Sequence, residues 1–221
     1  MLRRTGITRY EFHKEAVPRK NILKQLECDA ARMDPVMVHL CFTCDPYPYP
    51  NAVDSGDPWL VTHNAVTILK EHGHSVQILS KGGMAAQYDF DLLGPGDEYA
   101  ATLTFSNNAD SRLWEPHAAL PVERIEALRI AKGTGITTWA SLEPVIYPDQ
   151  SLQMLTHALE AGVSKVKVGP LNYKDKLPRW LADTVPDVDW RAFADKVQSQ
   201  CDAFGVECIL KDDLKKLAGL A

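Results

Sequence analysis

The stretch Lys165-Val-Lys-Val168, followed directly by Gly169-Pro170-Leu171-Asn172-Tyr173, is a short valine-rich run that stops abruptly at polar residues. Compact runs of this kind are typical of buried parallel strands, and in β/α barrels the chemistry gathers at the carboxyl ends of the strands. Five other apolar runs end in the same way, at 36–43, 75–79, 101–105, 137–140 and 206–210. The repeated pattern predicts parallel strands that bring their polar tips to one common edge.

Segments with helical spacing lie between most of these runs, as a parallel sheet requires, because each crossover needs a dozen or more residues. Glycine follows most of them, which indicates helix ends. The predicted helices cover 18–32, 57–72, 121–132, 149–161 and 190–204. Right-handed crossovers would curl this α/β series into either a barrel or a doubly wound sheet.

Composition agrees with one globular domain. With 221 residues and 45% hydrophobic content, the chain can bury one substantial core, so we expect a single domain over 1–221 with a poorly packed leader over 1–17. The net charge of −5 gives no general drive toward nucleic acid or anionic membrane. Several basic residues between positions 3 and 24 form either a phosphate-facing patch or, as we favour, a solvated face. No apolar stretch approaches the ~20 residues of a membrane span, and we expect a cytoplasmic protein.

The five cysteines do not suggest a disulfide framework. Cys41 and Cys44 form a Cys-x-x-Cys pair at the end of a predicted strand. Residues three apart in a strand point to opposite faces, so we predict that these two do not hold a metal and that the chain has no metal ligands.

Nine short motifs occur in an order that resembles one known family. They include Asp45-Pro46-Tyr47, Ser141-Leu142-Glu143-Pro144-Val145 and Leu210-Lys211-Asp212-Asp213. The nine lie at 42–47, 79–83, 101–105, 114–116, 124–128, 141–145, 167–173, 189–191 and 210–213. Together they resemble the spore photoproduct lyase-like branch of the radical S-adenosylmethionine (radical SAM) enzymes, over nearly the whole chain.

The resemblance implies a partial (β/α)6 TIM-like barrel of parallel strands that holds a 4Fe-4S cluster and S-adenosylmethionine at its carboxyl edge. In that family the cluster and cofactor generate a 5′-deoxyadenosyl radical that abstracts hydrogen from a substrate, here unknown. The Cys-x-x-x-Cys-x-x-Cys ligand motif of the family is absent from this sequence. We therefore expect the first strand and cluster loop to be absent and the isolated chain to be inactive. Truncation, a separate polypeptide that supplies the loop, and lost catalysis all remain open.

A missing first strand would leave an open sheet edge at 36–43, which invites a partner polypeptide or self-association. We make no prediction of the oligomeric state.

Four polar residues at the strand ends are candidate cofactor-binding residues. The resemblance places Asp45 beside the methionine amino group, although an Asp-Pro pair also forms turns. Lys81 can pair with the cofactor carboxylate, with Gly82 and Gly83 allowing close approach, or it can be an ordinary turn lysine. Ser106 and Asn107 can bind the ribose hydroxyls or simply cap a strand.

The candidate catalytic residues are Glu143, Lys167, Asn172 and Tyr173. Glu143 ends an apolar strand, where a carboxylate needs a partner, and Lys167, Lys211 or the cofactor can provide one. Lys167 alternates with valines and points either into the barrel lumen or toward the helices. Asn172 and Tyr173 follow at the rim and can contact substrate.

The loop that follows Asp45-Pro46 is rich in proline and should cover the mouth, where Tyr47 and Tyr49 can stack on an adenine or a substrate ring.

Two other functions remain open. One is a barrel lyase that uses Lys167 as a Schiff-base nucleophile. The other is a non-catalytic barrel that binds a nucleotide or nucleic acid through its basic front segment.

Overall fold

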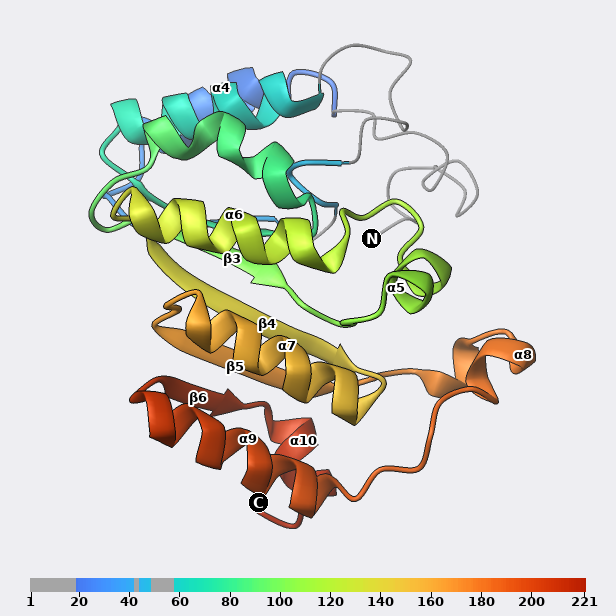
Figure 1. Cartoon of the computed structure of the whole chain (residues 1–221). Helices are drawn as coiled ribbons and strands as arrows, with labels where there is room; N and C mark the ends of the chain where they lie inside the picture. The colour runs from blue at the N-terminus through green and yellow to red at the C-terminus, as the bar shows by residue number, and fades with distance from the viewer. Residues whose placement is uncertain (1–18, 42–43, 49–57) are drawn as a thin grey trace.

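A curved sheet of six parallel strands runs through the molecule, with the strands in sequence order (Figure 1). The computed structural model describes residues 19–41, 44–48 and 58–221. The strands are β1 (Met37–Leu40), β2 (Ser75–Ser80), β3 (Glu98–Thr102), β4 (Thr137–Val145), β5 (Lys165–Pro170) and β6 (Glu207–Leu210). Sequential parallel strands in one open sheet confirm the predicted α/β class and the partial TIM-like barrel.

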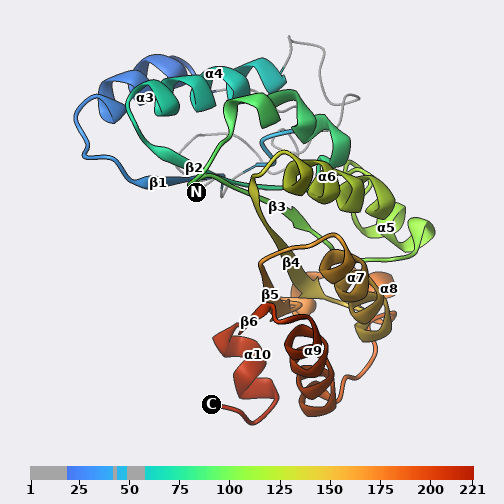
Figure 2. The ribbon, with the colours of Figure 1, turned by 60° about the vertical axis from the view of Figure 1, so that its left-hand side comes forward.

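Helices connect the strands and cover the convex face of the sheet (Figure 2). The longer ones are α3 (Ile22–Ala30), α4 (Pro58–Glu71), α6 (Pro121–Gly133), α7 (Pro148–Glu160) and α9 (Trp190–Phe204). Shorter ones are the 3₁₀ helices η2 (Gly83–Leu92) and η3 (Lys174–Lys176), and α5 (Asn108–Trp114), α8 (Arg179–Ala182) and α10 (Asp212–Leu217). Because α4, α6, α7 and α9 lie on the same side, the series forms a half-barrel and not a doubly wound sheet.

The hydrophobic core lies between the sheet and these helices. On β5, Val166 and Val168 are fully buried in this core, together with Leu155 of α7 and Val197 of α9. Side chains of a strand alternate between its two faces, so Lys165 and Lys167 point to the concave face. The question left open for Lys167 is thus settled in favour of the inner face.

The third strand begins three residues before its predicted start. Asp97 fixes this start, since its carboxylate accepts hydrogen bonds from the backbone nitrogens of Val76 (2.7 Å) and Gly94 (2.8 Å). The strand then opens with Glu98, a charged residue that the apolar pattern excluded but that is paired across the sheet with Lys165. The observed start of β3 therefore depends on side-chain partners that are distant in sequence, which the local apolar pattern does not report.

Several predicted features lie outside the described residues. They are the leader over 1–17, the basic residues of the front segment that precede position 18, and Tyr49. Within the described residues, no helix combines the length and apolarity needed to cross a membrane.

Candidate functional site

Asp45 joins the carboxyl ends of β1 and β2. Its Oδ1 accepts hydrogen bonds from the Tyr47 backbone nitrogen (2.9 Å) and Ser80 Oγ (2.6 Å), and its Oδ2 accepts one from the Lys81 backbone nitrogen (2.6 Å). A carboxylate offers about four acceptor positions, so the side chain retains room for one further donor. Asp45 is therefore a structural link that can still accept from a cofactor ammonium.

Lys81 takes part in a partly buried ion network. Its Nζ lies 2.7 Å from Glu115 Oε1, and Glu115 Oε2 lies 2.7 Å from Nη2 of Arg124. Burial by itself raises the pKa of the Glu115 carboxyl, but the charges of Lys81 and Arg124 outweigh burial and hold this pKa below its ordinary value. Glu115 is thus an anion at neutral pH, and it fixes the position of the Lys81 ammonium.

Arg124 anchors this network from the buried face of α6. Only 1% of its side chain is exposed. Its Nε donates to the Ala119 carbonyl (2.8 Å) and its Nη1 donates to the Thr102 carbonyl at the end of β3 (2.9 Å). The sequence analysis gave neither Glu115 nor Arg124 a role. A signal was present, since Arg124 occupies a core-facing position beside Ile125 on α6.

Ser106 and Asn107 lie between the sheet edge and the start of α5. Asn107 caps α5, since its Oδ1 accepts hydrogen bonds from the Ala109 and Asp110 backbone nitrogens at 2.7 and 3.3 Å. Ser106 Oγ donates to Gln153 on α7 (2.6 Å). Asn107 thus caps a helix and not a strand, and binding of the ribose by Ser106 and Asn107 stays a prediction, for which the Asn107 amide nitrogen and a Ser106 lone pair are available.

Glu143 forms an ion pair with Lys211, as one of the predicted pairings proposed. The two side chains meet across Gly169 of β5. A Cβ at position 169 would lie 3.0 Å from Cδ of Lys211 and 3.2 Å from Cδ of Glu143. A side chain at position 169 would therefore push the side chains of the ion pair away.

Lys167 lies on the concave face with its ammonium 4.3 Å from the centroid of a Trp139 ring. Its neighbour Lys165 lies 5.5 Å from the same side chain and pairs with Glu98 at 3.0 Å. Burial lowers the pKa of Lys167, and the positive charges of Lys165 and Lys211 lower it further. Among the described residues, no carboxylate pairs with the Lys167 ammonium.

Asn172 and Tyr173 lie at the rim after β5. Asn172 Nδ2 donates to Asp213 Oδ2 (3.2 Å). Tyr173 is 68% exposed, and the Lys176 ammonium lies 3.9 Å from its ring centroid. Their position agrees with the prediction, and a contact with substrate stays a prediction.

Tyr47 does not stack on a ligand, and that prediction was wrong. The side chain is fully buried, and its hydroxyl donates to Asp89 Oδ2 at 2.7 Å. His63 Nδ1 lies 2.7 Å from the other oxygen of Asp89. Burial raises the pKa of the Asp89 carboxyl, although the hydrogen bonds from Tyr47 and His63 oppose that rise. The tyrosine therefore anchors its loop to η2.

The Cys41 and Cys44 side chains converge, contrary to the expectation that they point to opposite faces. The strand ends at Leu40, and the two sulfur atoms lie 3.7 Å apart. Among the described residues, no group of three or more His, Cys, Asp or Glu side chains is placed to hold a metal. Since a 4Fe-4S cluster is held by several cysteine thiolates, the described residues do not fit one.

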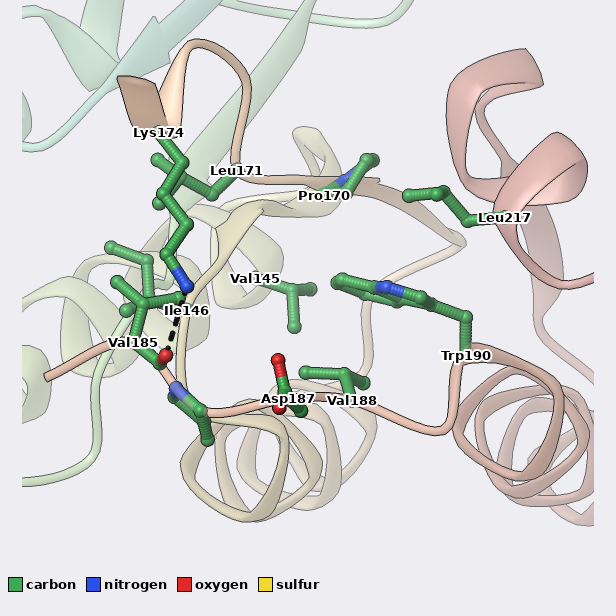
Figure 3. A pocket seen from close by; sticks show the side chains of 11 residues that line it. Val145, Ile146, Pro170, Leu171, Lys174, Val185, Asp187, Val188, Trp190 and Leu217 are labelled. Carbon is green, nitrogen blue, oxygen red and sulfur yellow. Dashed lines mark hydrogen bonds between the residues drawn. The ribbon is translucent and has the colours of Figure 1, made fainter. Parts of the chain in front are cut away.

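A cavity of about 310 Å³ lies beyond the ends of β4 and β5 (Figure 3). Apolar side chains form most of its wall, with Trp190 along one side and Asp187 directed into it. Lys174 lies on the opposite side and donates to the Val185 carbonyl at 3.1 Å. None of the predicted site residues lines this cavity.

Comparison with solved structures shows the same fold in SuiB and in spore photoproduct lyase. Streptococcus suis SuiB bound to S-adenosylmethionine matches with a TM-score of 0.62 and 12% identity, over 91% of this chain and 45% of SuiB. SuiB bound to its precursor peptide SuiA matches with a TM-score of 0.65 and 10% identity, over 94% of this chain and 46% of SuiB. Spore photoproduct lyase with a dinucleoside spore photoproduct matches with a TM-score of 0.55 and 12% identity, over 86% of this chain and 65% of the lyase.

This chain therefore spans less than half of SuiB and just under two thirds of the lyase. No protein-family model matches the sequence, and no curated protein matches it. At these identities the comparisons establish the fold and not the branch suggested by the sequence motifs. The parallel half-barrel of this chain has the same fold as SuiB and spore photoproduct lyase.

Proposed function

We propose that this chain is the S-adenosylmethionine-binding part of a radical SAM-type enzyme. One observation carries the proposal: the half-barrel superposes on S-adenosylmethionine-bound SuiB over 91% of its length. The sheet order supports it, because six parallel strands bring Asp45, Lys81, Ser106 and Glu143 to the same carboxyl edge.

The chemistry of the edge fits the amino-acid part of the cofactor. Asp45 has one acceptor position left for an ammonium. Lys81, positioned by Glu115, uses one of its three donors and offers the others to a carboxylate. Ser106 and Asn107 offer hydrogen-bonding groups to the ribose.

The described residues do not fit an iron–sulfur cluster, and the sequence lacks the family's three-cysteine motif. The proposal therefore covers only the binding of S-adenosylmethionine by this chain. This chain contributes the cofactor edge and the inner face of the sheet.

Calorimetric titration with S-adenosylmethionine tests the proposal. We expect saturable binding to the wild-type chain, and binding about ten-fold weaker or more in Lys81→Met, the scale of a lost hydrogen bond to a charged group. Lys196→Met, which removes an exposed lysine from α9, is the matched control and should bind as the wild type does. Failure of the folded wild-type chain to bind S-adenosylmethionine would overturn the proposal.

The inner face favours one second candidate, a Schiff-base lyase. Its basis is Lys167, whose pKa is lowered by burial and by neighbouring lysines, as an amine nucleophile requires. Borohydride reduction with a panel of aldehydes and ketones should then attach substrate to Lys167, and mass spectrometry should locate the adduct. A panel that labels Lys167 no more than Lys196 would eliminate this candidate.

A further inference from the structure

The inner face of β5 and β6 carries three lysines with unequal partners. Lys165 is held by Glu98 at 3.0 Å, and Lys211 is paired with Glu143. Lys167 lies between them without a carboxylate partner among the described residues. Two carboxylates raise the pKa of Lys167 from a distance, Glu98 more strongly than Glu207, but burial and the charge of Lys165 outweigh them and the pKa of Lys167 is lowered.

Trp139, whose ring centroid lies 4.3 Å from the Lys167 ammonium, supplies a second donor on the same face of the sheet. Its side chain is 2% exposed and lies under the Lys165 and Lys167 ammonium groups. The indole Nε1–H is buried and has no hydrogen-bond partner among the residues that the structure describes. A buried donor without an acceptor costs roughly 1–3 kcal/mol, so natural proteins rarely leave one.

The contact between Lys167 and the indole ring does not remove this deficit. A cation over an aromatic face is attracted by the ring, but this attraction satisfies neither the Nε1–H nor the three N–H donors of the ammonium. The buried Nε1–H therefore needs an oxygen acceptor, and the half-buried Lys167 ammonium can donate to an oxygen of the same ligand. An oxygen that also carries negative charge would compensate the unpaired lysine.

We propose that Lys167 and Trp139 form an oxyanion-binding site on the inner face of the half-barrel, which takes a carboxylate or phosphate group of the substrate. This inference rests on the proposed function in one respect, because it places the substrate on the concave side of the cofactor edge. The lysines on either side are paired with Glu98 and Glu143, which keeps them from competing for the ligand, so Lys167 supplies the positive charge of the site.

Indole N–H signals in a ¹H–¹⁵N NMR spectrum test the site directly. The chain has five tryptophans, and Trp139→Phe identifies the Trp139 signal by removing it. Sodium phosphate and sodium acetate serve as probes, each compared with sodium chloride at equal ionic strength. We expect the Trp139 signal to shift and saturate with at least one probe, and the stronger probe indicates which oxyanion the substrate carries.

The Lys167→Met variant should need about ten-fold more probe or higher for half-saturation, the scale of a charged hydrogen bond. Lys167→Arg, which keeps the charge, should retain most of the affinity, and Lys196→Met should match the wild type. The proposal is overturned if neither probe moves the Trp139 signal beyond the chloride control, or if Lys167→Met titrates as the wild type does. Binding of S-adenosylmethionine, measured on the same samples, is independent of this result, so each proposal can fail alone.

Discussion

Replacing Arg124 with methionine should destabilise the protein far more than loss of a surface arginine does. Arg124 is 1% exposed, and its partner Glu115 is 10% exposed at 2.7 Å. Removing one partner of a buried ion pair costs about 3–5 kcal/mol, because the remaining charge stays buried. Lys81 still pairs with Glu115 in the variant, so we expect the lower end, about 3 kcal/mol.

Urea unfolding followed by circular dichroism measures this loss. In thermal unfolding of a chain of this size, each kcal/mol of lost stability lowers the melting temperature by about 2–4 °C, so the thermal midpoint should fall by roughly 6–12 °C. The matched control is Arg129→Met on the same helix, whose pair with Glu126 spans 3.4 Å with both side chains nearly half exposed. An exposed pair contributes about 0–1 kcal/mol.

A double-mutant cycle with Glu115→Gln separates the ion pair from the other contacts of Arg124. The neutral glutamine removes the buried charge, so Arg124→Met should cost less in that background than in the wild type. Equal costs in the two backgrounds, or a loss in Arg124→Met no larger than that in Arg129→Met, would refute the ionic explanation.

Three further results are expected. The pKa of Glu115 is lower in the folded protein than its ordinary value of 4.5, so the ionised carboxylate stabilises the fold above pH 4.5 and this stabilisation is lost as the pH falls below that value. On acidification, the urea midpoint should therefore drop more steeply in the wild type than in Glu115→Gln. Gly169→Ala puts a Cβ 3.0 Å from Cδ of Lys211 and should cost about 1–3 kcal/mol in urea unfolding, whereas Gly133→Ala, with nothing within 4 Å, should not destabilise. Asp89→Asn keeps the shape but leaves one oxygen acceptor for the buried Tyr47 hydroxyl and the partly exposed His63 ring, and a cost below about 1 kcal/mol by thermal unfolding would contradict its anchoring role.

The sheet could be predicted from sequence because its signals are local. Valine-rich runs such as 165–168 and glycines such as Gly162 and Gly205 fix a strand or a helix end within a few residues. The observed helix Trp190–Phe204 has the predicted bounds for the same reason, with Asp189 as its N-cap. The short 3₁₀ segment Gly83–Leu92 was missed, since its turns carry no apolar period of 3.6 residues.

The ion-pair partners at the site could be predicted only where few residues of opposite charge were available. Glu143 needed a cation at the end of a buried strand, and Lys211 was among the few available. Lys81, by contrast, pairs with Glu115, which follows α5 and reaches β2 only through the packing of the α5–α6 connection. Contacts of this kind depend on how the helices pack, and no spacing rule along the chain reports them.

The polar side chains at the carboxyl edge of the sheet differ from those on its inner face in how many of their hydrogen-bonding groups other residues already use. At the edge, Asp45, Lys81 and Asn107 each hold local structure together, so changes there should alter folding and cofactor binding at once. On the inner face, Lys167 and Trp139 have donors that no described residue uses, so their chemistry is available to a ligand. Substrate selectivity should therefore reside on the inner face. In Lys167→Met, oxyanion binding should weaken while S-adenosylmethionine affinity and the urea midpoint stay near wild type, and a parallel loss of all three would show that this division is false.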